Sequence, residues 1–182
     1  MTKVCLAGAS GGAGSELARA IANAADLTLV AAISRTHAGR SLAEVLNEPR
    51  LTCPVYASAA EALANGCDVF VEYTKPDVAK NNIFNALQRG AHGVVGTSGL
   101  IEDDYAEIGV LARKQRLGVP ACGNFALTAV LLQKFAEVAA KLVPQWEIFD
   151  YAHDDKRDAP SGTVRELANR LSKVRRPESR FP

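Results

Sequence analysis

Two segments of this 182-residue sequence carry residue types that could bind and transform a small anionic molecule. Gly8–Gly14 is a glycine-rich loop, which can bring backbone N–H groups close to phosphate oxygens. Asp150–Thr163 holds a histidine, two cations and four carboxylates, and then opens a helix at Ser161. Because a helix start carries unpaired N–H groups and a partial positive charge, this loop, with Lys156 upstream, could receive a substrate carboxylate. The alternative is a solvated charged turn with an ordinary N-cap at Ser161 or Asp158.

The glycine loop stands where a nucleotide-binding loop would stand. It directly follows a strand-like run, Lys3–Ala7, and opens a helical pattern over Gly14–Ala24. Glycines at 8, 11 and 14 form GxxGxxG, a variant of the dinucleotide-binding fingerprint, in which a tight turn aims the helix dipole at a pyrophosphate. A simple strand-to-helix turn is the alternative, but the strand-turn-helix-strand context favours a nucleotide site.

The end of the second predicted strand, Leu27–Ser34, bears on the choice of cofactor. An acidic residue at this place bonds the ribose 2′-hydroxyl of NAD, whereas a basic residue suits the 2′-phosphate of NADP. The sequence reads Ser34-Arg35-Thr36-His37, with no acid before Glu44. A hydroxyl beside a guanidinium fits a phosphate, so the pattern favours NADPH, with NADH as a possible second cofactor. A solvated Arg35 in a surface loop is the alternative.

Two further loops follow predicted strands, where ligands bind in open parallel sheets. Tyr73-Thr74-Lys75-Pro76 follows one strand, and Gly96-Thr97-Ser98-Gly99 follows the next. Small and hydroxyl-bearing residues there could let a nicotinamide ring approach the backbone and could bond its carboxamide. Each loop alone is only a turn, but together with the glycine loop they outline one cleft.

These loops require a parallel sheet to position them. Short apolar runs alternate with helical patterns across residues 1–125, which predicts an α/β domain with a helix-covered parallel sheet. Strands are predicted at Lys3–Ala7, Leu27–Ser34, Val55–Ala57, Val69–Tyr73, Gly93–Gly96 and Gly118–Cys122. Helices are predicted at Gly14–Ala24, Ala59–Ala64, Pro76–Arg89 and Glu102–Gln115, and a short helix or turn is predicted at Ser41–Leu46.

The pattern changes over residues 126–182, where an α+β domain is predicted. A helix at Leu127–Leu142, a strand at Trp146–Tyr151 and a helix at Ala159–Val174 precede a polar tail. One strand between two helices is not a self-sufficient sheet. We therefore expect this second domain to be incomplete, or to be completed by further residues or subunits.

Composition excludes several classes of function. Hydrophobic residues make up 48% and charged residues 23%, and the net charge of +1 argues against nucleic-acid or membrane-surface binding. The first residues run straight into a strand, so no signal peptide is predicted, and the apolar runs are too short to cross a bilayer. The four cysteines are scattered, which indicates reduced thiols in a cytoplasmic protein, and neither they nor the three histidines show metal-ligand spacing.

At this point the motifs resemble those of the dihydrodipicolinate reductase (4-hydroxy-tetrahydrodipicolinate reductase) family of the lysine and diaminopimelate pathway. The resemblance covers essentially the whole chain in order and is most specific in its last string. It rests on Gly8–Gly14, Tyr73-Thr74-Lys75-Pro76, Gly96-Thr97-Ser98-Gly99, Asn124-Phe125, Lys156 and Asp158-Ala159-Pro160-Ser161-Gly162-Thr163.

The resemblance implies a Rossmann-like NAD(P)H-binding domain at 1–125 and the start of a substrate-binding domain, whose sheet builds a homotetramer, at 126–182. It implies hydride transfer from NAD(P)H to a cyclic imine dicarboxylate, with Lys156 as proton donor. His153 and Lys156 are the implied catalytic residues, and His153, Lys156, Ser161, Gly162 and Thr163 are implied to bind substrate. The cofactor-binding set comprises Gly8, Ser10, Gly11, Gly12, Ala13, Gly14, Ser34, Arg35, Tyr73, Thr74, Gly96, Thr97, Asn124 and Phe125.

The sequence also departs from the family pattern. Where the family reads His-His-Arg-His-Lys, this chain reads Ala152-His153-Asp154-Asp155-Lys156. A methyl group cannot transfer a proton, and two added acids disfavour a dianionic substrate. The segment after Phe125, Ala126–Val130, also differs, and the chain ends where the family would supply the remaining strands.

Three hypotheses follow. The first is an NADPH-dependent reductase acting on the lysine-pathway intermediate. The second is a paralogue that reduces another cyclic imine or carbonyl compound, with fewer carboxylates or with an amine for the added acids to pair with. The third is a non-catalytic homologue that keeps the nucleotide-binding fold, which loss of the histidine favours and retention of Lys156 disfavours.

Overall fold

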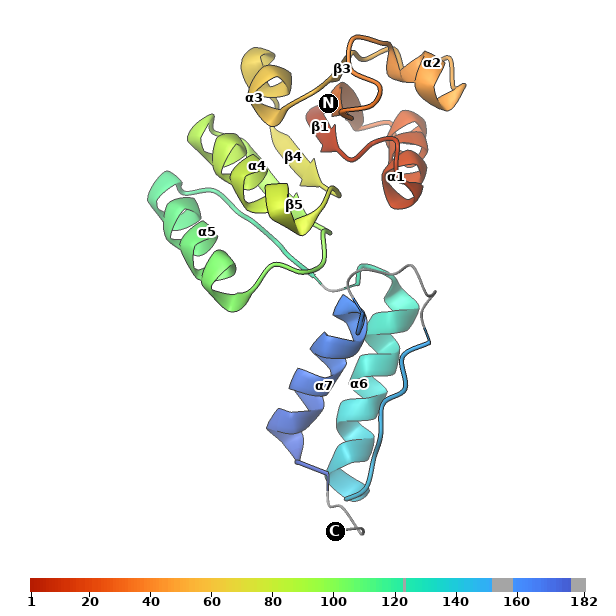
Figure 1. Ribbon diagram of the computed structural model, residues 1–182, viewed down its shortest axis with the longest axis vertical. Helices are drawn as coiled ribbons and strands as arrows, with labels where there is room; N and C mark the ends of the chain where they lie inside the picture. The colour runs from red at the N-terminus through yellow and green to blue at the C-terminus, as the bar shows by residue number, and fades with distance from the viewer. Residues whose placement is uncertain (123, 152–158, 178–182) are drawn as a thin grey trace. The chain divides into compact units, whose positions relative to one another are not determined.

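The structure, a computed structural model, describes residues 1–122, 124–151 and 159–177 (Figure 1). The chain divides into two compact units, Met1–Ala121 and Cys122–Pro182. The division lies slightly before the predicted domain boundary after Phe125.

The first unit is built on a five-stranded sheet in which all strands are parallel, as predicted for an α/β fold. The strand order is β3-β2-β1-β4-β5, so β1 lies at the centre of the sheet. The apolar runs in the sequence correspond to β1 (Thr2–Ala7), β2 (Leu27–Ile33), β3 (Val55–Tyr56), β4 (Val69–Glu72) and β5 (His92–Val95).

Helices cover both faces of this sheet (Figure 1). Alternate residues of β1 point to opposite faces, because successive side chains of a strand alternate. Val4 and Leu6 pack in a core with α1 (Gly12–Asn23) and α2 (Leu42–Leu46). Cys5 and Ala7 pack in the opposite core, which includes residues of α3 (Ala59–Ala62), the 3₁₀ turn Leu63–Asn65, α4 (Pro76–Gln88) and α5 (Glu102–Gln115).

The strand order creates a crevice at one edge of the sheet. From β1 the chain moves outward to β2 on one side, and it later returns to β4 on the other side of β1. The loops after β1 and β4 therefore diverge at the carboxyl edge, which is where open α/β sheets bind ligands.

The predicted strand at Gly118–Cys122 is wrong, because the segment makes only one isolated parallel bridge, between Val95 and Ala121. Gly93 and Val95 of β5 donate backbone hydrogen bonds to the carbonyls of Gly118 and Pro120. Pro120 has no N–H to return such a bond, so a regular ladder does not develop.

The second unit consists of two helices and the segment that joins them. Helix α6 spans Leu127–Leu142, as predicted, and α7 spans Gly162–Val174, starting later than the predicted Ala159. The predicted strand at Trp146–Tyr151 is wrong, since none of the described residues pairs with it in a ladder. Its apolar side chains instead line a cavity of about 360 Å³ with residues of α6 and α7.

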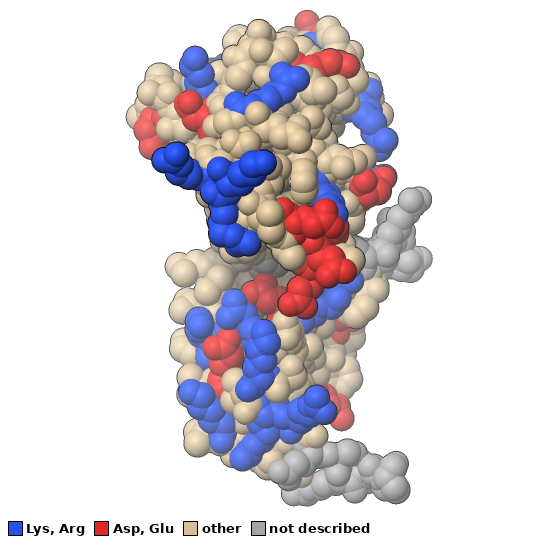
Figure 2. Space-filling model, turned by 90° about the vertical axis from the view of Figure 1, so that its left-hand side faces the viewer, with Lys and Arg blue, Asp and Glu red and all other residues tan. Residues whose placement is uncertain are grey.

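Charges on the surface are mixed. Figure 2 shows basic and acidic side chains close together on one face, in keeping with the net charge of +1. Among the helices that the structure describes, none has the length and apolarity needed to span a membrane.

Candidate functional site

The glycine loop is compressed between two backbone segments. Gly8 follows β1 with φ at +80°, and a Cβ there would lie 2.3 Å from the carbonyl oxygen of Tyr73. A Cβ on Gly14 would lie 2.1 Å from the carbonyl oxygen of Gly8. Glycine is required at both positions, so the loop brings β1, α1 and the end of β4 into direct contact.

The start of α1 has the properties of an anion receptor. Gly11 is the N-cap residue, no side chain caps the helix start among the described residues, and the first turn contains no acid. The N–H groups of Gly12 and Ala13 lie in this first turn, where the helix dipole is positive. This is the arrangement that the sequence predicts for a pyrophosphate.

Hydroxyl groups gather where β2 ends, beside the glycine loop. The Oγ atoms of Ser10 and Ser34 are 2.8 Å apart, and Ser34 Oγ lies 3.3 Å from Thr36 Oγ1. Arg35 is exposed and forms no ion pair with any residue that the structure describes. Its guanidinium can therefore meet an anion from solvent.

One cavity of about 510 Å³ joins these elements to the end of β4. Lys75 and Asn82, from the start and first half of α4, also line it, although the sequence analysis singled out neither as a site residue. The predicted cofactor-binding residues along its wall are Gly8, Ser10, Gly11, Ser34, Arg35, Tyr73 and Thr74. Gly12, Ala13, Gly14, Gly96 and Thr97 do not line this cavity, and Asn124 and Phe125 belong to the second unit.

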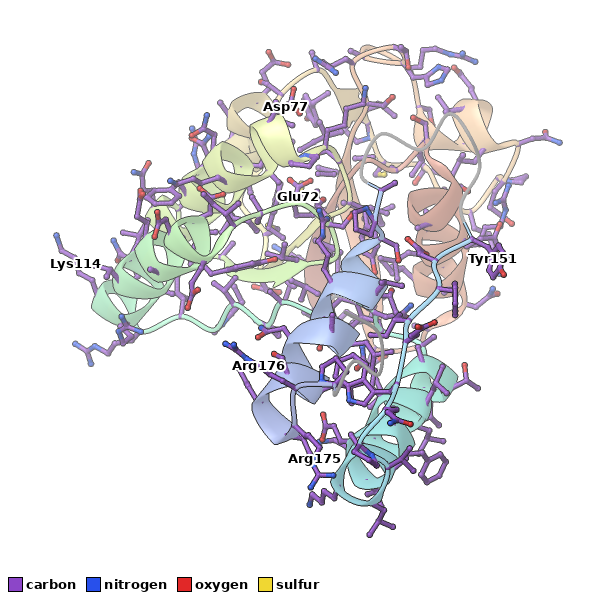
Figure 3. The ribbon with its side chains drawn as sticks, turned by 60° about the horizontal axis from the view of Figure 1, so that its bottom comes forward. Glu72, Asp77, Lys114, Tyr151, Arg175 and Arg176 are labelled. Carbon is purple, nitrogen blue, oxygen red and sulfur yellow. The ribbon has the colours of Figure 1, made fainter. Side chains whose placement is uncertain are left out.

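The most buried polar group of this region is Glu72, the last residue of β4, which the sequence analysis missed (Figure 3). Its side chain is 0% exposed. Oε1 accepts a hydrogen bond of 2.6 Å from the Thr74 backbone N–H, one from the Thr74 hydroxyl, and one of 3.3 Å from the Thr97 hydroxyl. Oε2 accepts a bond of 2.8 Å from Asn82 Nδ2.

Burial raises the pKa of the Glu72 carboxyl, and the bonds from Thr74, Asn82 and Thr97 oppose this rise. The only sequence signal for this residue was an acid that ends a continuous apolar run, Val69–Val71. Its partners come from a loop, a helix and a second loop, so periodicity alone could not identify the group.

Tyr73 lies over Gly96, at the adjoining ends of β4 and β5. A Cβ on Gly96 would lie 2.2 Å from Cζ of the Tyr73 ring. The sequence analysis predicted that a nicotinamide ring could approach the backbone at Gly96. In this structure the Tyr73 ring lies against that backbone. Gly96 thus serves the packing of Tyr73.

The second unit brings together several residues of the predicted substrate site. Ser161 is the N-cap of α7, and its hydroxyl accepts a bond of 3.3 Å from the Val164 N–H. Its own N–H and hydroxyl donate to the Asp150 carboxylate, at 2.6 and 3.2 Å. The acidic partner was not predicted, and it occupies donors of Ser161 that the resemblance assigns to substrate.

Asn124 lies beside the start of the same helix. Its Nδ2 donates a hydrogen bond of 3.2 Å to Thr163 Oγ1, while its Oδ1 accepts one of 2.8 Å from the Ala126 N–H. Gly162 is the first residue of α7, and Phe125 is half-exposed. His153 and Lys156 lie outside the described residues.

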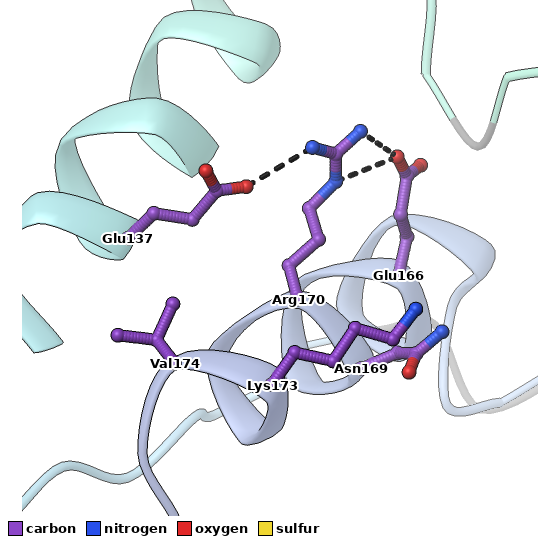
Figure 4. Close-up of a pocket in the computed structure, with 6 residues that line it drawn as sticks. All are labelled: Glu137, Glu166, Asn169, Arg170, Lys173 and Val174. Atoms are coloured by element: carbon purple, nitrogen blue, oxygen red, sulfur yellow. Dashed lines mark hydrogen bonds and ion pairs between the residues drawn. The ribbon is translucent and has the colours of Figure 1, made fainter.

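A second polar cavity, of about 480 Å³, lies between α6 and α7 (Figure 4). Arg170 of α7 bridges Glu137 of α6, at 3.0 Å, and Glu166 of its own helix, at 2.7 Å. Most charged side chains of this cavity pair with one another. We therefore interpret the cluster as an ion-pair network that joins α6 to α7. No cluster of three or more histidine, cysteine or acidic side chains that could hold a metal occurs in the described parts of the chain.

Comparison with protein families gives two adjoining matches. Residues 2–125 match the family described as dihydrodipicolinate reductase, N-terminus, and residues 128–180 match dihydrodipicolinate reductase, C-terminus. Together these matches cover nearly the whole chain.

Individual relatives agree with the family matches. The chain is 39% identical over 171 residues to the 4-hydroxy-tetrahydrodipicolinate reductase of Syntrophomonas wolfei. This alignment covers 93% of the chain and 64% of that relative, so the chain spans just under two thirds of the relative's length.

Solved structures show a similar fold. The dipicolinate-bound dihydrodipicolinate reductase from Paenisporosarcina sp. TG-14 matches with a TM-score of 0.76 and 29% identity, covering 100% of this chain and 69% of that one. The WlbA dehydrogenase from Thermus thermophilus, in complex with NAD and alpha-ketoglutarate, matches with a TM-score of 0.58 and 16% identity, covering 74% and 46%. The second likeness concerns the fold alone.

Proposed function

Because the chain belongs to the dihydrodipicolinate reductase family, we propose that it carries out the NAD(P)H-dependent reduction of 4-hydroxy-tetrahydrodipicolinate to tetrahydrodipicolinate, in lysine and diaminopimelate biosynthesis. The observation that supports this activity most directly is the cavity at the carboxyl edge of the first unit's sheet. There the glycine loop, including Gly11 at the N-cap of α1, and the end of β2 with Arg35 line one crevice.

The residues of this crevice fit a dinucleotide. The Gly8–Gly14 loop has no room for side chains at its two ends, so its backbone can approach a pyrophosphate closely. The crevice runs from the end of β2, which suits the adenosine half, to the end of β4, which suits the nicotinamide half. When bound, the reduced nicotinamide would supply a hydride to the unsaturated ring of the substrate, and the 4-hydroxyl would leave as water, which balances the conversion to tetrahydrodipicolinate.

We further propose that NADPH is the preferred cofactor. Arg35 offers a planar set of donors at the place of the ribose 2′-phosphate, and the hydroxyls of Ser10 and Ser34 lie beside it. NAD enzymes carry an acid at the end of this strand, and this chain has none between Ser34 and Glu44.

The substrate would be held by the second unit. Lys156 would donate the proton to the imine nitrogen, and His153 would contact the substrate. The N–H and hydroxyl groups of Ser161, Gly162 and Thr163 would bind a carboxylate at the start of α7. For Ser161 this requires a change of partners, because its donors hold Asp150 in this structure.

A second candidate is a family paralogue that reduces a different cyclic imine. The specific observation in its favour is Ala152, with Asp154 and Asp155 close behind it, where the family reads three basic residues. Such a loop suits a substrate with fewer carboxylates or with an amine.

An NADPH-oxidation assay with the lysine-pathway intermediate, run beside other cyclic imines and beside NADPH binding by fluorescence, tests these candidates. Turnover of the pathway intermediate supports the reductase, and turnover of another imine alone supports the paralogue. NADPH binding without any turnover would indicate a non-catalytic homologue. The variant Ala152→His separates the two enzymatic candidates further. Increased turnover of the pathway intermediate would show that the family site lacks only this histidine. Unchanged turnover would show that the pocket is adapted to another substrate.

We also propose a homotetramer in the cytoplasm. Helix α6 carries large apolar side chains that are 64–80% exposed in this structure, a surface that association would cover. Light scattering of the purified protein tests the assembly. The side chains concerned are Leu127, Leu132, Phe135 and Leu142.

A further inference from the structure

Glu72 is a fully buried acid for which the proposed reaction has no assigned task. It forms no ion pair with any described residue, and its carboxylate is held only by neutral donors. Burying a carboxylate without a cation is costly, even when it is hydrogen-bonded. This burial costs stability, so the position of Glu72 at the end of β4, beside a cavity, points to a functional role for its carboxylate.

The carboxylate determines what the Thr74 hydroxyl can offer a ligand. A hydroxyl has one proton to donate and two lone pairs that accept. The Thr74 hydroxyl donates its proton to Glu72 Oε1, so only its accepting lone pairs remain. Since Thr74 lines the cavity, the chain presents an acceptor at that point of the wall.

Further bonds hold Glu72 in this orientation. Asn82 donates to Oε2, and the Thr97 hydroxyl lies within 3.3 Å of Oε1. The backbone carbonyl of Glu72 accepts bonds from the N–H groups of Gly96, at 2.9 Å, and Thr97, at 3.2 Å. The loops after β4 and β5 are therefore both tied to this residue, and the carboxylate cannot turn away from Thr74 without breaking several bonds.

We propose that Glu72 is a positioning residue that makes the Thr74 hydroxyl an acceptor and thereby selects a dinucleotide whose pyridine ring carries a hydrogen-bond donor, the NH₂ of a carboxamide. This inference rests on the proposed binding of a nicotinamide cofactor in the cavity. A ring that carries an acetyl group offers no donor to Thr74. A ring that carries a carboxylate brings a negative charge to an acceptor and is disfavoured further.

Equilibrium binding of three NADP⁺ forms tests the proposal without any turnover. The probes are NADP⁺ itself, its 3-acetylpyridine analogue and its nicotinic acid analogue. The wild-type chain should bind NADP⁺ about tenfold more tightly than the acetyl analogue, the expected effect of one hydrogen bond, and should bind the carboxylate form most weakly.

Three variants separate positioning from a structural role. Thr74→Val should bind NADP⁺ and the acetyl analogue equally, whereas Thr74→Ser, which keeps the hydroxyl, should retain the preference. Glu72→Gln, whose neutral amide is a weaker acceptor, should show an intermediate preference. Val71→Ala in the same strand, a side chain 7% exposed in the opposite core, should lower thermal stability and leave the preference unchanged.

The outcomes are distinguishable. A wild-type chain that binds all three dinucleotides equally, or a Thr74→Val or Glu72→Gln variant that keeps the full preference, overturns the role of Glu72 while cofactor binding stands. A folded wild-type chain that binds none of the three overturns the proposed function, and this inference with it.

Discussion

The candidate sites of the two units are assembled in different ways. In the first unit Gly8, Ser34 and Thr74 are far apart in the sequence, and the parallel sheet brings them to one edge. In the second unit Asp150 and Ser161 are eleven positions apart, and they meet at the start of one helix. The first arrangement depends on the whole sheet, and the second joins two residues that are close in the sequence.

This difference concerns how tightly the structure constrains each candidate site. Close backbone contacts around Gly8 and Gly14 leave little freedom to the first site. Departures from the family pattern lie at Ala152, Asp154 and Asp155 and over Ala126–Val130, whereas the glycine loop retains the glycines that its packing requires.

Loss of the proposed proton donor should give the largest effect and separate the two sites most clearly. Lys156→Ala should lower the rate of imine reduction by about 10²–10⁴-fold, the usual contribution of a positioned acid. NADPH affinity should not change, because the dinucleotide would bind to the first unit. Steady-state NADPH oxidation and fluorescence titration measure the two quantities. The control is Lys173→Ala, an exposed lysine of α7. Unchanged turnover in Lys156→Ala would refute the proposed role.

The second prediction concerns the close packing of the glycine loop. Gly14→Ala places a Cβ 2.1 Å from a backbone oxygen, so the variant should lose about 1–3 kcal/mol of stability and bind NADPH more weakly. Gly12→Ala is the matched control in the same helix turn, because its Cβ would meet nothing within 4 Å. Urea unfolding and NADPH titration of both variants test this. Equal stability of the two alanine variants would contradict the account of the loop.

The third prediction tests the cofactor choice at the end of β2. Arg35→Ala should weaken NADPH binding by about tenfold and leave NADH binding nearly unchanged, because only NADPH carries the 2′-phosphate that the guanidinium would bind. Dissociation constants for the two cofactors measure the ratio. Arg89→Ala, an exposed arginine at the end of α4, is the control for loss of one positive charge. An unchanged ratio in Arg35→Ala would exclude the proposed phosphate contact.

The smallest predicted effect concerns stability and pH. Burial raises the pKa of Glu72 above its ordinary value of 4.5, so the folded chain holds this proton more tightly than the unfolded chain. Its contribution to stability is present below that value and is lost as pH rises through the raised pKa. The hydrogen bond with Cys67 and burial raise the pKa of the nearby Cys5 thiol, so this thiol stays neutral over the same range.

Glu72→Gln does not titrate and should lack this loss, so its stability relative to wild type should increase from about pH 4 toward neutrality. Urea unfolding of both proteins across this range gives the difference. A difference that does not change with pH would show that the Glu72 carboxyl titrates normally.

Long periodic segments were predicted well from the sequence. Glu102–Gln115 and Leu127–Leu142 form helices with the predicted bounds, because their apolar spacing and flanking residues act locally. Gly118–Cys122 and Trp146–Tyr151 were predicted as strands from short apolar runs. A strand also needs a partner for its N–H and C=O groups, and that requirement cannot be read from a short apolar run.

The sequence alone determined the class of the first domain, the position of its glycine loop and the residues at its strand ends, because each depends on neighbours within a few positions. Only the tertiary structure decided that Glu72 lies beneath Thr74 and Asn82, that Tyr73 covers Gly96, and that Asp150 occupies the donors of Ser161. The physical reason is the same in each case. A buried polar group takes its partner from whichever segment the fold brings near, and sequence spacing does not specify that segment.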